Sequence, residues 1–321
     1  MRKSANWLKL IGLALWFYII LRLDFGRILQ VFEAMDIRWF LLAVVSLVGV
    51  SVFKAMRWST VLNLQGVRYK LGKTVGISFV SSFFGLMIPG KMGDIIKVTY
   101  VKSSGLSTAR GLVSVVLDRI YDLVVLLFLS TVGLLYFSSM FTSEVRQTGF
   151  ILAALALIAV LVVSQRGRVF TLMRTLLKVA LSPSSYETIS HEWGTFKNDL
   201  ASVAKKTVVP MLTFSVLAYL SMFCQFFAVA RGLGLEPPFL YLGLSLCIAT
   251  LVSLLPISVG GLGTREAVFI LMLGKIAISA ESAVLLSFVD LVVFAVLLPG
   301  VFTLPFWLRT RTRDSSTRRN S

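Results

Sequence analysis

Histidine, cysteine and acidic residues are scarce in this sequence. One histidine and two cysteines occur among 321 residues, and 15 Asp and Glu stand against 32 Lys and Arg. His191 lies in a polar stretch, whereas Cys224 and Cys247 lie inside apolar segments, where we interpret them as small core residues. A metal cluster, a Ser/His/Asp arrangement and a Cys/His pair therefore lack their parts. We expect no cofactor and no enzyme activity.

Charge of either sign is also rare. Charged residues make up 15% of the chain and hydrophobic residues 57%, and the mean hydropathy is +0.86. A soluble domain of this length cannot bury so much apolar surface in one core. The apolar residues form long blocks that approach or exceed the ~20 residues needed to cross a bilayer. These blocks are residues 7–21, 39–53, 111–137, 149–163, 208–230, 239–257 and 283–308. The sequence predicts an all-α integral membrane protein.

The net charge of +17 comes from short segments between these blocks and from the tail at residues 309–321. This placement is typical of cytoplasmic loops beside anionic lipid, and it argues against nucleic acid as a partner. The positive-inside rule then predicts cytoplasmic N- and C-termini in a cell (plasma or inner) membrane. The same rule predicts a cytoplasmic interfacial segment at about 166–206. Within it, apolar residues at helical spacing predict a surface helix near 169–181.

Two apolar segments have both flanks on one side of the membrane under this rule. Residues 74–89 end at Pro89-Gly90 between basic flanks, and residues 239–275 are interrupted by Pro256 and a cluster of glycines. We expect both to be re-entrant hairpins, because broken backbone at membrane depth must be buried in protein or line a wet cavity.

About six full crossings then remain, beginning with helices near 7–23 and 39–57. They fall into two copies of opposite orientation, an inverted-topology repeat. Repeat one covers about 7–138 and repeat two about 149–308, within a single membrane domain at 1–308.

Residue matches support the duplication. Gly93-x-x-x-Lys97 aligns with Gly261-x-x-x-Arg265, and Asp122-Leu-Val-Val aligns with Asp290-Leu-Val-Val. The spacing between the two motifs is the same in both copies. Glycine, leucine and valine are common here, so chance is the alternative explanation of the short matches.

Two segments could bind an anionic headgroup at a broken helix. Such a site uses free N–H groups and nearby cations, and its candidate residues are Lys91, Gly93, Asp94, Lys97, Gly260, Gly261, Gly263, Arg265 and Glu266. The first segment could equally be an ordinary basic loop. The second is not a nucleotide-binding P-loop, because it has no βαβ context and no Gly-Lys-Ser/Thr ending.

A further set of charges lies inside membrane helices: Asp118, Arg119, Asp122 and Asp290. Such groups are costly in lipid and must face protein or water. Asp118 and Asp122 share one helix face, and Lys97 or Arg265 are candidate partners. A structural salt-bridge cluster is the alternative to a functional site.

These motifs resemble the lysylphosphatidylglycerol synthase transmembrane family. The resemblance spans about residues 10–305 and rests on family motif positions, namely Pro89, Gly93, Asp94, Arg119, Asp122, Pro256, Gly260, Gly261, Gly263 and Glu266. The chain departs from the family pattern at Asp118, where Glu is more usual, and at Ser287–Asp290, where a basic residue is expected. That second departure puts a symmetric charge pairing in doubt.

The resemblance implies a flippase-like protein that moves a lipid with a charged headgroup, such as an aminoacylated phospholipid or a polyprenyl-phosphate-linked sugar, between leaflets. Only a basic tail follows Leu308, so we expect no synthesis of lysyl-lipid. The alternatives are a membrane enzyme acting on polyprenyl-phosphate-linked sugars and a non-transporting scaffold for a lipid- or glycan-synthesis partner.

Overall fold

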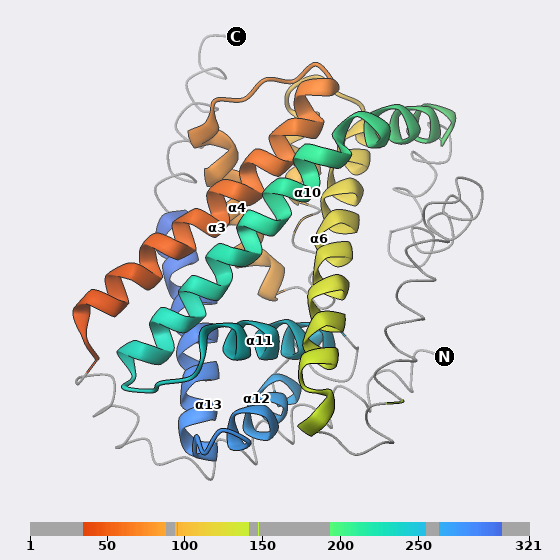
Figure 1. Ribbon diagram of the computed structural model, residues 1–321. Helices are drawn as coiled ribbons and strands as arrows, with labels where there is room; N and C mark the ends of the chain where they lie inside the picture. The colour runs from red at the N-terminus through yellow and green to blue at the C-terminus, as the bar shows by residue number, and fades with distance from the viewer. Residues whose placement is uncertain are drawn as a thin grey trace, which may run out of the picture. The chain divides into compact units, whose positions relative to one another are not determined.

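The computed structural model describes residues 35–87, 94, 96–140, 147, 193–254 and 263–303 (Figure 1). Within these ranges the chain forms helices and no strands. Three of the described helices are long and apolar enough to cross a bilayer, namely Ile37–Leu64, Lys206–Gly232 and Ala280–Thr303. The prediction of an all-α membrane protein is confirmed at this level. The helices expected near 7–23, 149–165 and 169–181 lie outside the described residues.

Contacts between Cα atoms group the chain into two compact units. The first contains Met1–Ala55, Lys70–Asp94 and Leu217–Ser321, and the second contains Met56–Tyr69 and Ile95–Val216. The long helices α3 (Ile37–Leu64) and α10 (Trp193–Gly232) are each divided between the two units, α3 after Ala55 and α10 after Val216.

In the first unit, the N-terminal part of α3 packs antiparallel to the C-terminal part of α10. The Trp39 ring meets the Phe227 ring edge-on at 6.1 Å between centroids. Further along, Gly49 lies against Ser221, where a Cβ on the glycine would come within 3.2 Å of the serine Oγ. Residue numbers rise along α3 as they fall along α10, which fixes the antiparallel direction.

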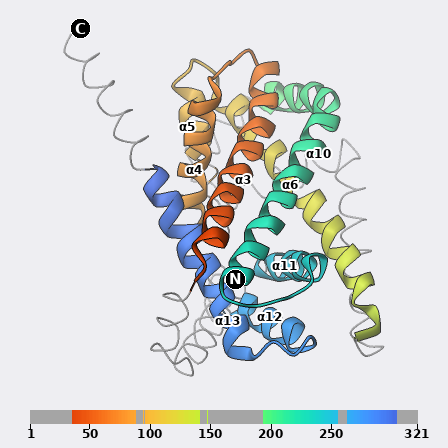
Figure 2. The same ribbon diagram turned by 60° about the vertical axis from the view of Figure 1, so that its left-hand side comes forward.

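The rest of the first unit consists mainly of short apolar helices. These are α4 (Leu71–Met87), α11 (Phe239–Ser253), α12 (Thr264–Gly274), α13 (Ala280–Val289) and the π-helical continuation η3 (Asp290–Leu297). Helix α12 packs against both α11 and α13, and the three lie together in Figures 1 and 2. Helices α4, α11 and α12 have 17, 15 and 11 residues, fewer than the ~20 of a full crossing.

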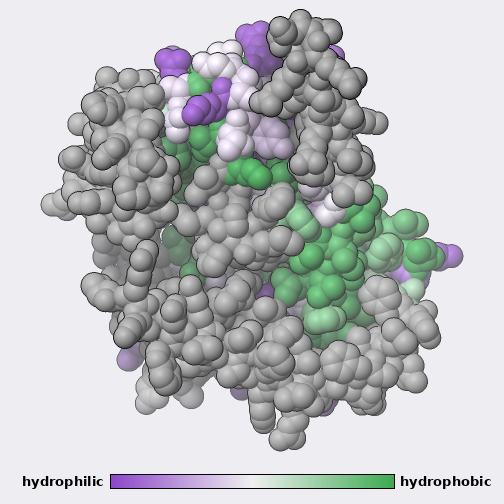
Figure 3. Space-filling view, turned by 180° about the vertical axis from the view of Figure 1, so that it is seen from behind, coloured by the Kyte–Doolittle hydropathy of each residue, from purple (hydrophilic) through white to green (hydrophobic). Residues whose placement is uncertain are grey.

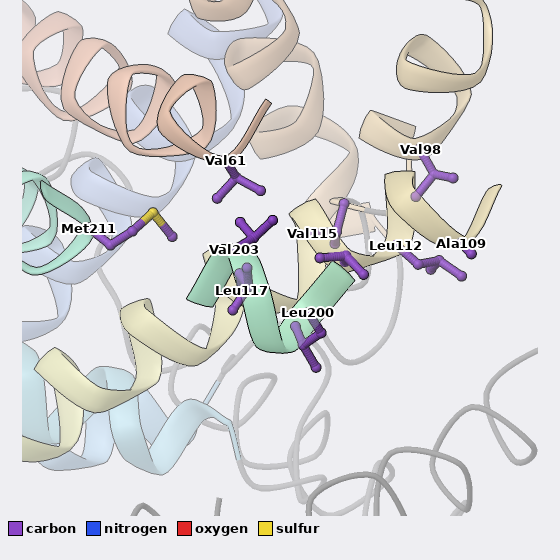
Figure 4. Packing of buried hydrophobic residues seen from close by; sticks show 10 residues of the cluster. Val61, Val98, Ala109, Leu112, Val115, Leu117, Leu200, Val203 and Met211 are labelled. Atoms are coloured by element: carbon purple, nitrogen blue, oxygen red, sulfur yellow. The ribbon is translucent and has the colours of Figure 1, made fainter. Parts of the chain in front are cut away.

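The second unit is built on α6 (Thr108–Tyr136), with the short α5 (Ile96–Lys102) packed against it and η2 (Ser138–Met140) after it. Its core contains buried side chains from α5 and α6 together with Val61 of α3 and Leu200, Val203 and Met211 of α10. Figure 4 shows these side chains gathered around α6.

Helix α10 begins earlier than the sequence suggested. We expected an interfacial segment to about residue 206 and a membrane helix near 208–230, but the helix runs unbroken from Trp193 and contains Pro210. Leu200 and Val203 are 6% and 4% exposed, because they join the core of the second unit. That burial favours a continuous helix over a separate surface segment.

Large apolar side chains remain exposed along the long helices. They include Ile37, Leu41, Val45, Phe128, Leu135, Val209, Leu220 and Val301. On the face seen in Figure 3, the described residues left in view include a broad hydrophobic area. Apolar exposure on this scale suits contact with lipid rather than with water.

Candidate functional site

Asp118 of α6 lies at the centre of a buried charge network. Its side chain is 3% exposed. Oδ1 accepts a hydrogen bond from Arg57 Nε at 2.6 Å, and Oδ2 accepts one from Lys97 Nζ at 2.8 Å. Lys97 is the second residue of α5, and the packing of α5 on α6 places its side chain beside the carboxylate.

Arg57 extends this network by one helical turn. Its Nη1 donates to Asp122 Oδ1 at 3.1 Å and to Ser215 Oγ at 2.9 Å. Asp118 and Asp122 can both face Arg57 because residues four apart share one face of a helix. We call Arg57, Lys97, Asp118 and Asp122 the first charge cluster. Its two cations and two carboxylates balance.

An indole ring also contacts the first charge cluster. Lys97 Nζ lies 5.5 Å from the centroid of the Trp58 ring, within range of a cation–π interaction. Trp58 is fully buried, and its Nε1 donates to Ser114 Oγ at 3.0 Å. The ring therefore holds one side of the ammonium group while Asp118 holds another.

A second charge cluster consists of Gln225, Arg265 and Asp290 in the first unit. Arg265 Nη2 donates to Asp290 Oδ2, and Gln225 Nε2 donates to Asp290 Oδ1 at 2.9 Å. The guanidinium carbon lies 5.9 Å from the Phe226 ring and 5.4 Å from the Phe269 ring. One cation and one carboxylate again balance, and their side chains are 12% and 11% exposed.

Glu266 lies next to Arg265 but has different hydrogen-bond partners. Its Oε2 accepts from the backbone N–H of Gly263 at 2.6 Å, and its Oε1 accepts from Ser287 Oγ at 2.8 Å. The first contact caps the N-terminus of α12, and the second ties α12 to α13. Gly263 has φ 83°, a conformation that favours glycine.

The remaining predicted residues are placed as follows. Asp94 is buried and accepts a hydrogen bond from Ser81 Oγ. Arg119 lies on α6, partly exposed. Lys91, Gly93, Gly260 and Gly261 lie outside the described residues. No group of three or more His, Cys, Asp or Glu side chains that could hold a metal ion occurs in the described part of the chain.

Sequence reasoning missed Arg57 and Gln225. We expected Arg57 to be a cytoplasmic charge at the end of a helix, but α3 continues to Leu64 and the arginine is 2% exposed. Its apolar neighbours on both sides were the available signal. Gln225 carries no charge and lies in an apolar block, so nothing in its surroundings pointed to a hydrogen bond with Asp290.

The departure seen at Ser287–Asp290 also has an explanation. A basic residue was expected in that segment, and its absence put a symmetric pairing in doubt. The cation is instead Arg265, 25 residues earlier on α12. Both clusters therefore hold a cation from a short helix, α5 or α12, against a carboxylate that lies later in the chain.

Comparison with known proteins agrees with the motifs. The sequence model of the family described as the lysylphosphatidylglycerol synthase TM region matches residues 7–301. A UPF0104 membrane protein of Pyrococcus horikoshii is 23% identical over 307 residues, covering 88% of this chain and 90% of that protein. The family match covers the described helices except for the last two residues of the helix that ends at Thr303. The chain belongs to the lysylphosphatidylglycerol synthase transmembrane family.

Proposed function

We propose that this membrane protein moves a lipid with a charged or phosphate-bearing headgroup between the two leaflets of a cell membrane. Both termini lie in the cytoplasm in this proposal. Family membership and the long apolar helices support a role within the bilayer.

The observation that carries the proposal is the first charge cluster. Arg57 lies within a helix apolar enough to cross a membrane, and it is buried against Asp118 and Asp122. Buried ion pairs are often no more stable than a well-packed hydrophobic replacement, and ionisable groups at membrane depth are costly. Recognition of a charged headgroup gives such a network a use that stability alone does not.

In this mechanism the headgroup exchanges places with one partner of an ion pair. A phosphate would compete with a carboxylate for Lys97 or Arg265, and a cationic amine would compete with Lys97 for Asp118. The acyl chains stay in lipid. Rocking of the two copies of an inverted repeat would then open the site to either side in turn.

The test uses purified protein in phosphatidylcholine vesicles that contain a trace of phosphatidylglycerol labelled with a fluorophore on one acyl chain. A reductant added outside quenches only the outer leaflet, so further loss of fluorescence measures transbilayer movement. A parallel series uses labelled lysylphosphatidylglycerol. We expect the protein to accelerate movement of at least one of these lipids at least tenfold over protein-free vesicles.

The matched variants lie on one short helix. Lys97→Ala should reduce the protein-dependent rate about tenfold or more, whereas Lys102→Ala should leave it within about twofold, because Lys102 is exposed at the end of α5. Lys97→Arg, which keeps the charge, should retain more of the rate than Lys97→Ala and guards against simple unfolding.

Two other outcomes would replace the proposal. Conversion of the labelled lipid, or of a polyprenyl-phosphate-linked sugar, to a product of different mass would identify an enzyme. Folded protein that moves neither lipid, with Lys97→Ala and Lys102→Ala behaving alike, would favour a scaffold for a synthesis partner.

A further inference from the structure

The ends of several helices recur at a constant shift along the sequence. Helices α3 and α10 end at Leu64 and Gly232. Helices α4 and α11 begin at Leu71 and Phe239, and helices α5 and α12 begin at Ile96 and Thr264. Each pair differs by 168 residues (232 − 64 = 168), which is also the shift between Lys97 and Arg265.

The two long helices also end in the same way. Gly66 and Gly234 have φ values of 87° and 74°. The N–H of the next residue reaches back to a carbonyl five residues earlier: Val67 donates to Leu62 and Leu235 donates to Ala230, both at 2.9 Å. This hydrogen bond is that of a Schellman C-cap. Both the glycines and the bonded residues keep the shift of 168.

In each charge cluster, one carboxylate accepts a hydrogen bond from a side chain, and the two donors occupy equivalent positions in the two copies. Arg57 Nη1 donates to Asp122 Oδ1, and Gln225 Nε2 donates to Asp290 Oδ1. Donor and acceptor are 65 residues apart in both cases. Arg57 and Gln225 differ by 168 residues, as do Asp122 and Asp290.

In each cluster, one cation also contacts an aromatic ring, and that ring belongs to the residue that follows Arg57 or Gln225 in the sequence. Lys97 lies 5.5 Å from the Trp58 ring, and Arg265 lies 5.9 Å from the Phe226 ring. Trp58 and Phe226 differ by the same shift. A hydrogen bond and a cation–π contact have different physical origins, so their recurrence at one shift is strong support for duplication of a whole site.

At the four positions of the first charge cluster, the second copy differs by one cation and one carboxylate. The position equivalent to Asp118 is Leu286, and the position equivalent to Arg57 is Gln225. The second charge cluster therefore lacks one carboxylate and one cation relative to the first, and Arg265 and Asp290 balance. Asp290 alone accepts from both Gln225 and Arg265, whereas Arg57 and Lys97 share two carboxylates.

We propose that Arg57 and Gln225 are equivalent positioning residues in two copies of one cation–carboxylate site, and that each copy must preserve charge neutrality rather than a particular set of residues. The inference deepens the proposed function, on which only its transport readout rests. It follows that Arg57→Gln with Asp118→Leu should convert the first charge cluster into the composition of the second, with Lys97 pairing with Asp122 as Arg265 pairs with Asp290.

The experiment compares Arg57→Gln, Asp118→Leu and the double variant in the full chain. Either single change leaves an unmatched buried charge and should lower the thermal unfolding midpoint by roughly 10 °C. The double variant should recover at least about half of that loss. Arg68→Gln, which removes a charge from an exposed residue, is the control and should change the midpoint by less than about 2 °C.

The reciprocal variants test the same rule in the other copy. Gln225→Arg or Leu286→Asp alone should destabilise the protein, and the two together should be better tolerated than either. The lipid-transport rate should be at least about tenfold slower in each single variant, and the Arg57→Gln/Asp118→Leu variant should recover part of that loss.

Additive losses would overturn the inference. If both double variants melt as low as the sum of their single changes predicts, the two clusters are not interchangeable copies. If stability is rescued but the wild-type protein moves no lipid, the proposed function fails while the duplicated site stands. If wild type moves lipid and the stable Arg57→Gln/Asp118→Leu variant does not, neutrality is not the requirement and the positioning role assigned here is wrong.

Discussion

At the scale of single residues, the buried carboxylates of this protein have two different kinds of partner. Asp118 and Asp290 accept from cationic side chains. Glu266 instead accepts from the backbone N–H of Gly263, before α12, and from the hydroxyl of Ser287 on α13. We therefore assign to Glu266 a part in the positioning of α12, next to Arg265.

This assignment predicts a loss of stability for Glu266→Ala. The change leaves the Gly263 N–H and the Ser287 hydroxyl without their acceptor in a buried site, which costs about 1–3 kcal/mol. Glu236→Ala removes an exposed carboxylate that pairs with Arg231, and it should cost less than about 1 kcal/mol. Unfolding in detergent, followed by circular dichroism, measures both. Equal effects of the two changes would rule out the capping role.

The charged residues of the site were only partly predictable from sequence. Asp118 stood out because a carboxylate within an apolar block needs a partner, and Lys97 was one of two candidates for it. The choice between Lys97 and Arg265 depends on which helix packs beside Asp118, and local sequence does not contain that information. Gln225 was beyond prediction for the same reason, because its importance comes only from its contact with Asp290.

At the scale of helices, apolar block lengths predicted where most elements lie. The blocks near 39–53 and 111–137 correspond to α3 and α6. Their ends were less predictable, because Arg57 and the residues before 208 are polar enough to resemble loops. In both places tertiary burial continues the helix: Arg57 pairs with Asp118, and Leu200 and Val203 enter a core.

The crossing of α10 and α11 depends on a small residue. A Cβ added to Gly243 would lie 2.4 Å from Cδ2 of Phe223, whose ring is 4% exposed and has little room to move. Gly243→Ala should therefore lower stability by about 1–3 kcal/mol, the usual cost of overpacking.

Gly72 of α4 provides the matched control, since no atom lies within 4 Å of the position that its Cβ would take. Gly72→Ala should be neutral or stabilising by up to about 1 kcal/mol, because alanine loses less backbone entropy in a helix. Thermal unfolding of the two variants side by side gives the comparison. A Gly243→Ala protein as stable as Gly72→Ala would show that α11 does not pack closely on Phe223.

At the scale of the whole molecule, membrane residence was the most predictable property. It follows from hydropathy summed over hundreds of residues and is insensitive to any single misread position. Orientation is different, because it depends on a few loop charges. We propose that the two copies of the site have opposite orientation in the membrane.

Equivalent loops allow that claim to be measured with cysteine labelling. Arg68 and Glu236 follow the C-caps of α3 and α10, both are exposed, and they differ by 168 residues. Lys102 and Glu281 mark the far ends of the two expected hairpins. Single cysteines at these four positions, in a protein with Cys224 and Cys247 replaced by alanine, are treated in intact cells with a thiol reagent that cannot cross membranes.

We predict that cysteines at positions 68 and 102 react only after the cells are opened, and that cysteines at positions 236 and 281 react in intact cells. That result would place both hairpins and give the two copies opposite orientation. Labelling of 68 and 236 from the same side would contradict the inverted repeat, and with it the alternating use of two equivalent sites.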